Sequence, residues 1–211
     1  MKTIEIPKLT TSSDTVGAVR TSGVTAHIDQ VNWRDKFPKS VPVSVQLLHD
    51  GERLFLYFSI IGEAIRAVNT NDFDPIWEDS CVEFFMQREG EKTYRNFECN
   101  PLGALLAAER ENREAARNLV GDMPSIVRHT TVHHRYDESG NQVSDWTLYL
   151  EISKKAMGFG ENESLSGQTI RANFYKCGDE TVEPHFLSWN RIETCEPNFH
   201  VPEFFGMVKF A

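Results

Sequence analysis

The chain lacks the basic surface that nucleic acids and anionic membranes attract. Its 22 lysines and arginines are outnumbered by 31 aspartates and glutamates, which gives a net charge of -9 over 211 residues. The basic residues form no local cluster, so an acidic chain of this kind is repelled on average by both types of anionic surface. The sequence therefore predicts no nucleic-acid partner and no membrane partner.

Cysteine is scarce and scattered. The four cysteines are Cys81, Cys99, Cys177 and Cys195, and no two of them form a CxxC pair. This spacing argues against a zinc knuckle and against a redox motif. We expect free and mostly buried thiols, because isolated cysteines on strands behave as small apolar residues.

The motifs of common catalysts and of export signals are missing as well. The sequence contains no GxSxG, no HExxH and no glycine-rich phosphate loop. Residues 1–10 carry charge and Pro7 without an apolar run of seven or more, so they predict neither a signal peptide nor a membrane span. Both a cytoplasmic protein and an exported, processed precursor are consistent with this start.

The chain does contain a series of short strand patterns. Residues 43–49 and 54–61 flank Asp50-Gly51, the strongest hairpin signal in the sequence. The other main predicted strands cover residues 24–28, 81–87, 93–100, 126–134, 146–152, 169–177 and 206–210. Alanine, glutamate and arginine dominate residues 109–119, and Gly121 stands where a helix would end, so one short surface helix is predicted there.

These patterns predict an all-β fold. A chain of this length can bury a full core as one domain, here residues 1–211, with the polar residues 1–22 as a leader that wraps the fold. About ten strands with one short surface helix make an antiparallel β-sandwich of immunoglobulin-like or jelly-roll-like type.

A candidate binding site lies around the predicted hairpin of residues 81–100. Trp77 precedes it in a loop that begins after Pro75. The polar residues of the hairpin are Glu83, Arg95, Asn96, Glu98 and Asn100. They offer more hydrogen-bonding capacity than a sheet packed on both faces can satisfy internally, which indicates the rim of a site. Asn173 belongs to the polar face of a later strand that could join it.

Four motifs of the chain resemble family 9 carbohydrate-binding modules and their stand-alone relatives. The motifs are residues 49–51 (HDG) before an aromatic strand, 76–85 (IWEDSCVEFF), 94–103 (YRNFECNPLG) and an ending that contains 186–189 (FLSW) and 199–206 (FHVPEFFG). The resemblance implies an antiparallel β-sandwich that binds the end of a mono- or oligosaccharide between two tryptophans without cleaving it. It also implies a role in polysaccharide catabolism of the xylan or glucan type, beside glycoside hydrolases of the same pathway.

The resemblance assigns roles residue by residue. Trp77 matches the first stacking aromatic and Trp189 the second, while Glu83 matches the acid. Arg95 with Asn96 matches the basic and amide pair, and Asn173 and Asn190 compete for a further asparagine. Some xylanase-linked members hold structural calcium, for which this sequence shows no assignable residues.

The chemistry of these residues agrees with the resemblance. A sugar ring offers an apolar C–H face that stacks on an indole, and its hydroxyls need paired donors and acceptors. An ion pair between Glu83 and Arg95 would hold both side chains ready for a hydroxyl. Either tryptophan could instead belong to the core, and the ion pair could serve the sheet alone.

Two other functions stay open at this point. Glu83 and Glu98 on neighbouring strands could form the carboxyl pair of a glycoside hydrolase. A haem-binding sandwich would use a methionine and a histidine as iron ligands. The candidate haem ligands are Met86 or Met123 with His129 or His133.

Overall fold

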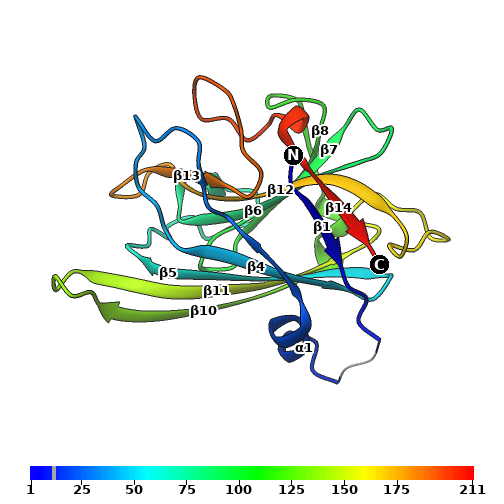
Figure 1. Cartoon of the computed structure of the whole chain (residues 1–211), viewed down its shortest axis with the longest axis horizontal. Coiled ribbons are helices and arrows are strands. Elements are labelled where there is room, and N and C mark those ends of the chain that lie inside the picture. The colour runs from blue at the N-terminus through cyan, green and yellow to red at the C-terminus, as the bar shows by residue number, and fades with distance from the viewer. Residues whose placement is uncertain (11–12) are drawn as a thin grey trace.

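The computed structural model describes residues 1–10 and 13–211, and in this part of the chain two β-sheets pack face to face (Figure 1). The larger sheet runs in the order β1 (Thr3–Ile6), β14 (Gly206–Phe210), β12 (Thr169–Gly178), β6 (Cys81–Arg88), β7 (Tyr94–Cys99), β8 (Leu105–Arg110), β9 (Ala116–Asn118). Beside this path, β13 (His185–Ser188) pairs with both β12 and β3 (Gln30–Val31). The smaller sheet runs in the order β10 (Ile126–Tyr136), β11 (Gln142–Ser153), β5 (Arg53–Glu63), β4 (Val43–His49), β2 (Val24–His27).

The predicted β-sandwich is confirmed. The named strands pair antiparallel, apart from the parallel pair of β1 and β14. The described residues contain more strands than the ten or so predicted, because short strands such as β3 and β9 pair at the margins of the larger sheet. In the described part of the chain, three short 3-10 helices, η1 (Ile76–Glu78), η2 (Val120–Ser125) and η3 (Pro202–Phe204), lie in the connections.

The core between the sheets follows from the period-two alternation of the strands. The rings of Phe84, Phe97 and Phe174, on three neighbouring strands of the larger sheet, stack in a row. They belong to one buried cluster with apolar residues of the smaller sheet such as Phe58 and Leu148. Successive side chains of a strand point to opposite faces of a sheet. The residues directly before and after each of these phenylalanines along its strand therefore point to the outer face.

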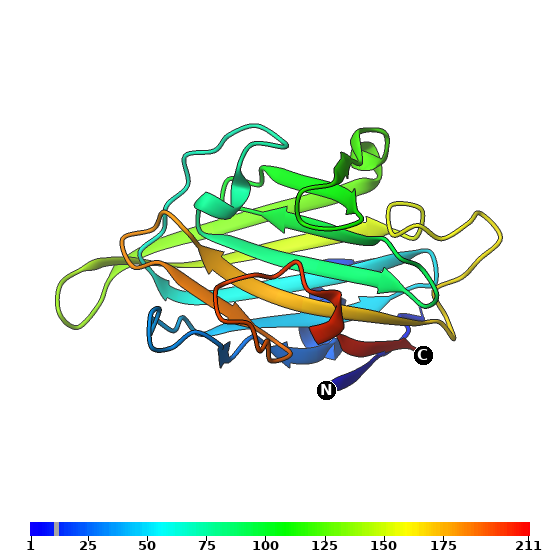
Figure 2. The ribbon, with the colours of Figure 1, turned by 90° about the horizontal axis from the view of Figure 1, so that it is seen from above.

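That outer face of the larger sheet is covered by loops. Phe85 and Tyr175 form a second buried cluster with Phe199 and Phe205 from the C-terminal segment. Figure 2 shows this segment, coloured orange to red, crossing the larger sheet. Both faces of the larger sheet are therefore buried, and polar residues on its outer face lie under a loop cover.

The predicted helix over residues 109–119 is wrong. The chain forms β8, a tight turn and β9 instead, and Asn112 Oδ1 accepts hydrogen bonds from the backbone N–H groups of Glu114 and Ala115 in that turn. Pairing of β9 with β8 overrides a helix propensity that is weak per residue.

The one α-helix of the described residues lies in the segment predicted to be a leader. Helix α1 (Thr15–Ser22) is capped by Asp14, whose carboxylate accepts from the Gly17 N–H, and its Val19 packs against Leu48 and Phe55 of the smaller sheet. Strand β1 adds a margin to the larger sheet. Residues 11–12 of the predicted leader lie outside the described residues, and the rest of it is built into the fold rather than wrapped around it.

The cysteine prediction is confirmed. All four thiols are free, and Cys195 is exposed while the other three are buried. Among the described residues, no helix has both the length and the apolar character needed to cross a membrane.

A buried ion pair joins the two sheets. Lys176 Nζ of β12 lies 2.7 Å from Glu63 Oε1 of β5, and neither side chain is exposed by more than 2 %. The indole Nε1 of Trp146 donates to the other oxygen of Glu63 at 2.8 Å, and His185 Nε2 lies 2.9 Å from Lys176 Nζ. Burial alone would raise the pKa of Glu63, but Lys176 and the hydrogen bonds outweigh it and hold the pKa at about 2.

The low pKa of Glu63 predicts a loss of stability in acid. The folded-state pKa lies below the ordinary value of 4.5, so the unfolded chain takes up the proton first as the pH falls. The stabilisation is present above about pH 4.5 and is lost towards pH 2, by up to about 3 kcal/mol. As the pH falls from 4.5 to 2, the free energy of unfolding measured in urea should decrease more steeply for the wild type than for Glu63→Gln. Equal decreases in the two proteins would contradict the low pKa of Glu63.

Candidate functional site

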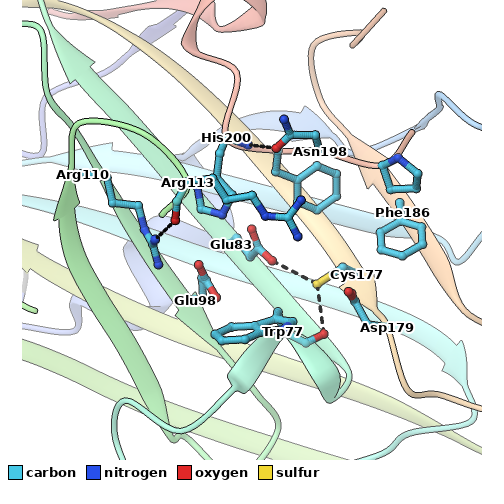
Figure 3. Close-up of a pocket in the computed structure, with 12 residues that line it drawn as sticks. Trp77, Glu83, Glu98, Arg110, Arg113, Cys177, Asp179, Phe186, Asn198 and His200 are labelled. Carbon is cyan, nitrogen blue, oxygen red and sulfur yellow. Dashed lines mark hydrogen bonds between the residues drawn. The ribbon is translucent and has the colours of Figure 1, made fainter. Parts of the chain in front are cut away.

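A pocket of about 180 Å³ opens on the outer face of the larger sheet (Figure 3). A volume of this size suits one small ring rather than several. The lining residues are Trp77, Glu83, Glu98, Arg110, Arg113, Cys177, Asp179, Phe186, Pro197, Asn198, Phe199 and His200.

Trp77 forms one wall. It lies in η1 with 39 % of its surface exposed, whereas its neighbour Ile76 is fully buried. The loop that carries it is anchored by Asp79, whose buried carboxylate pairs with Arg66 and accepts hydrogen bonds from Asn100 Nδ2 and from two backbone N–H groups of the loop. The indole is therefore held in a fixed loop while it stays accessible from the pocket.

Two carboxyl groups form the floor. Glu83 of β6 and Glu98 of β7 stand directly opposite each other, and both are at least 97 % buried. Cys177 Sγ donates to Glu83 Oε1 at 3.0 Å. Asn96 Nδ2 donates to Glu98 Oε1 at 2.7 Å, and Glu98 Oε2 has no hydrogen-bond partner among the described residues.

The floor resists carrying two negative charges. Burial, reinforced by the charge of Glu98, raises the pKa of Glu83 well above its usual value. Burial also raises the pKa of Glu98 to about 7, although Arg110 and Asn96 oppose the shift. Buried like charges on opposite strand positions cannot both ionise easily, so the floor offers a protonated donor beside an acceptor.

The rim carries further charges. Burial raises the pKa of Asp179 to about 6, with Arg113 opposing the shift. Arg110 Nε donates to Asn96 Oδ1 at 2.8 Å, so Arg110, Asn96 and Glu98 form one hydrogen-bonded chain.

The wall beside the C-terminal segment is made of rings. Phe186 and Phe199 lie with their centroids 6.3 Å apart, and Tyr94 Oη lies 2.9 Å from Nδ1 of His200. Burial, then the charges of Arg110 and Arg113, lowers the pKa of His200 to about 3, so its imidazole is neutral at neutral pH. The pocket thus combines aromatic walls with convergent polar groups, as small-ligand sites do.

Three of the predicted site residues meet in this pocket. Trp77, Glu83 and Glu98 line it, and Asn96 is buried directly behind Glu98. The structure places the other four outside the lining: Arg95, Asn173, Trp189 and Asn190.

The expected ion pair of Glu83 with Arg95 is wrong. Arg95 and Glu98 are three positions apart on β7, so their side chains leave opposite faces of the strand. The guanidinium of Arg95 pairs with Glu109 at 2.7 Å and donates to the carbonyl of Ala156 at 2.7 Å. Its place near the acids of the floor is taken by Arg110.

The predicted pair of stacking tryptophans is corrected too. Trp189 is 4 % exposed and packs edge-on against Phe174 in the core between the sheets, with ring centroids 5.6 Å apart. A Cβ atom on Gly206 would lie 2.4 Å from this indole, so the ring is closed in on that side. Phe186 and Phe199, rather than Trp189, stand in the pocket with Trp77.

The side chains of Asn173 and Asn190 form hydrogen bonds with backbone groups. Asn173 accepts from the N–H of Asn190 at 2.8 Å and donates to its carbonyl at 3.0 Å. Asn190 in turn accepts from the Lys2 N–H and donates to the Phe204 carbonyl, both at 2.7 Å. These hydrogen bonds join the backbone at residues 2, 190 and 204, next to the C-terminal segment that covers the larger sheet.

Sequence reasoning missed the residues that loops bring to the pocket. Arg110 and Arg113 fell in the segment wrongly predicted as a helix. Phe199 and His200 stood in a recognised motif but had received no role. Asp179 follows β12 at a position that carries no signal in the sequence.

The implied calcium does not fit the clustered ligands. The group of three or more His, Cys, Asp or Glu ligands that converges in the described part of the chain is Cys81, Glu83 and Cys177. Calcium takes six to eight oxygen ligands, and two of these three donors are sulfur. Structural calcium therefore stays an untested expectation.

A β-sandwich with an aromatic-walled, acid-floored pocket on one sheet defines a small-ligand-binding domain of the all-β class. The comparisons with known proteins give the family. The family model described as carbohydrate-binding family 9 matches residues 19–210, so the chain belongs to carbohydrate-binding family 9.

Solved structures agree with this assignment. A Bacteroides uniformis ATCC 8492 protein, whose proposed function is carbohydrate binding, shares 34 % identity at a TM-score of 0.86, covering 100 % of this chain and 99 % of the other. A family 9 carbohydrate-binding module from Caldicellulosiruptor kristjanssonii in complex with glucose has 10 % identity and a TM-score of 0.63, covering 100 % and 96 %. The cellotriose complex of a family 9 module from the same organism has 9 % identity and a TM-score of 0.64, covering 99 % and 93 %. The search of curated proteins found no match.

Proposed function

We propose that this protein binds the end of a saccharide, without cleaving it, in the pocket beside Trp77. The observation that carries the proposal is an indole 39 % exposed on a fixed loop above buried carboxyl groups. An indole face supports the C–H face of a sugar ring, and the carboxyl and guanidinium groups match its hydroxyls. Family membership supports the same ligand class.

The hydrogen-bonding state of the floor favours a hydroxyl-bearing ligand. Glu98 Oε2 is buried without a partner among the described residues. An unpartnered buried acceptor costs about 1 to 3 kcal/mol, which a donor from the ligand would recover. Glu83, in its protonated form, can donate to a second oxygen of the same ring.

The size of the pocket favours a chain end. A space of about 180 Å³ admits one ring, so the rest of an oligosaccharide would extend out of the pocket into solvent. Neighbours in the fold bind glucose and cellotriose, which supports gluco-configured ends as first candidates. We extend the proposal to xylose ends, because xylose presents the same ring without the exocyclic group.

One observation favours a second function, glycoside hydrolysis. Glu83 and Glu98 are opposite each other on neighbouring strands, a placement near the roughly 5 Å separation of a retaining carboxyl pair. Their raised pKa values are also typical of acid and base catalysts. Binding without hydrolysis is the stronger proposal, since an acid floor facing hydroxyl groups needs no bond cleavage to explain it.

The test is calorimetric titration with glucose, xylose and their short β-linked oligomers, beside an assay for released reducing sugar. We expect saturable binding, no release, and a loss of about 1 to 3 kcal/mol in binding free energy for Glu98→Gln, as for a hydrogen bond to a charged group. Glu5→Gln, at an exposed position of strand β1, is the matched control and should bind as the wild type does.

Two results would count against the proposal. Hydrolysis by the wild type that Glu98→Gln abolishes would make the protein an enzyme. Equal affinity of Glu98→Gln and the wild type would place the ligand elsewhere.

A further inference from the structure

The floor of the pocket contains a second cluster with its own chemistry. Cys81 and Cys177 are directly opposite each other on β6 and β12, and Glu83 lies two positions along β6 on the same face. One ligand atom from each of these three residues lies within 4.8 Å of the other two. Residues far apart in the sequence are thus brought together by strand pairing.

The spacing suits a tetrahedral metal ion. Bonds of about 2.0 to 2.3 Å hold the ligand atoms of a tetrahedral ion roughly 3.3 to 3.8 Å apart. Cys177 Sγ and Glu83 Oε1 lie 3.0 Å apart and would separate by a few tenths of an ångström on binding an ion, while Cys81 Sγ lies within 4.8 Å of both ligand atoms. Three protein ligands with one free position is a known arrangement for zinc.

The ligand types select the class of metal. Two thiolates with one carboxylate favour zinc and similar thiophilic ions over calcium or magnesium, which prefer oxygen alone. On binding, each thiol bonds to the metal through sulfur and releases its proton to solvent.

Further carboxyl groups stand beside this cluster, in a pocket that Arg110 and Arg113 also line. Glu98 stands opposite Glu83 with one oxygen unpartnered among the described residues, and Asp179 lines the same pocket. The pocket also supplies the route in, because Cys177 and Glu83 line it, while Cys81 is enclosed behind them.

We propose that Cys81, Glu83 and Cys177 bind one thiophilic divalent ion of the zinc type, with the fourth coordination position facing the pocket. The site shares Glu83 with the proposed saccharide site. Metal and saccharide therefore exclude each other.

The test uses the reduced, chelator-treated full chain with Cd²⁺ or Zn²⁺ as the probe. Cd²⁺ should bind at one equivalent with a thiolate-to-cadmium charge-transfer band in the ultraviolet, and Zn²⁺ should raise the thermal midpoint of the wild type. Cys81→Ser and Cys177→Ser should each weaken uptake by more than the about 10- to 100-fold that an outer-shell loss costs. Cys195→Ser removes the exposed thiol instead and should leave uptake unchanged.

Glu83→Gln keeps both thiols and should also weaken uptake, so the result does not depend on a cysteine variant that folds poorly. Absence of both the charge-transfer band and the thermal shift in the wild type would overturn the proposal. So would uptake that survives in Cys177→Ser but disappears in Cys195→Ser. These measurements need no saccharide, so their failure is distinct from a failure of saccharide binding.

Competition then locates the ion. A saturating saccharide should lower the apparent affinity for Cd²⁺, and the metal-loaded protein should lose affinity for the saccharide by the same factor. Unchanged saccharide affinity in the metal-loaded protein would contradict a site that includes Glu83.

Discussion

Replacing Lys176 with methionine is expected to lower the free energy of unfolding by about 3 to 5 kcal/mol, the cost of removing one partner from a buried ion pair. Lys176 is fully buried and its ammonium lies 2.7 Å from Glu63 Oε1. Methionine fills a similar volume but leaves the Glu63 carboxylate in the core with Trp146 Nε1 and with the imidazole of His185, whose Nε2 lies 3.5 Å from Oε1, in place of the ammonium. Urea unfolding at neutral pH measures the change.

Two variants control this prediction. Lys209→Met changes an exposed lysine on β14 and should alter stability by less than about 0.5 kcal/mol. The double variant Glu63→Gln with Lys176→Met removes both charges while keeping an acceptor for Trp146, so it should recover most of the loss. If Lys176→Met alone costs no more than Lys209→Met, the ion pair does not form in solution.

Replacing Trp77 with alanine is expected to weaken saccharide binding by about 1.5 to 3 kcal/mol, the scale of an aromatic hot spot. This corresponds to a dissociation constant about 10- to 150-fold higher. Thermal stability should change little, because the ring is 39 % exposed and its loop is anchored by Asp79 rather than by the indole. Calorimetry and thermal unfolding of the same preparation measure both effects.

Trp189→Ala is the matched comparison. Trp189 is buried beside Phe174, so its truncation should cost stability by about 3 to 5 kcal/mol. In protein that remains folded at low temperature, its saccharide affinity should stay close to that of the wild type. A loss of 3 kcal/mol or more in the stability of Trp77→Ala would instead make Trp77 a core residue, and the site would have to be sought elsewhere on the larger sheet.

The two sets of predictions concern two buried carboxyl groups, Glu63 and Glu83, that contact neighbouring residues of β12 on its opposite faces. Lys176 and Cys177 are neighbours on β12 that leave opposite faces, one towards Glu63 between the sheets and one towards Glu83 in the pocket. The first carboxylate has a cation 2.7 Å away and a pKa of about 2. Glu83 instead accepts a hydrogen bond from the thiol of Cys177, and burial raises its pKa. An incompletely compensated carboxyl group is the feature that makes the outer face suitable for a ligand.

The sequence by itself determined the sandwich and three residues that line the candidate pocket. Period-two alternation and the Asp50-Gly51 turn are local signals, so they predicted the main strands without knowledge of their partners. Trp77, Glu83 and Glu98 could be selected because they lie in one hairpin and the loop before it. Strand parity alone would also have placed Arg95 on the face opposite Glu98.

Only the tertiary structure decided which residues complete the pocket and which residues leave it. The helix propensity of residues 109–119 is a sum of small local preferences, and pairing of β8 with β9 outweighed it and brought Arg110 to the floor. Trp189 could be assigned to a site or to the core with equal local justification, since its burial beside Phe174 depends on the packing of two sheets. The meeting of Cys81 with Cys177 likewise follows from the register of β6 against β12, a long-range pairing that spacing along the chain does not encode.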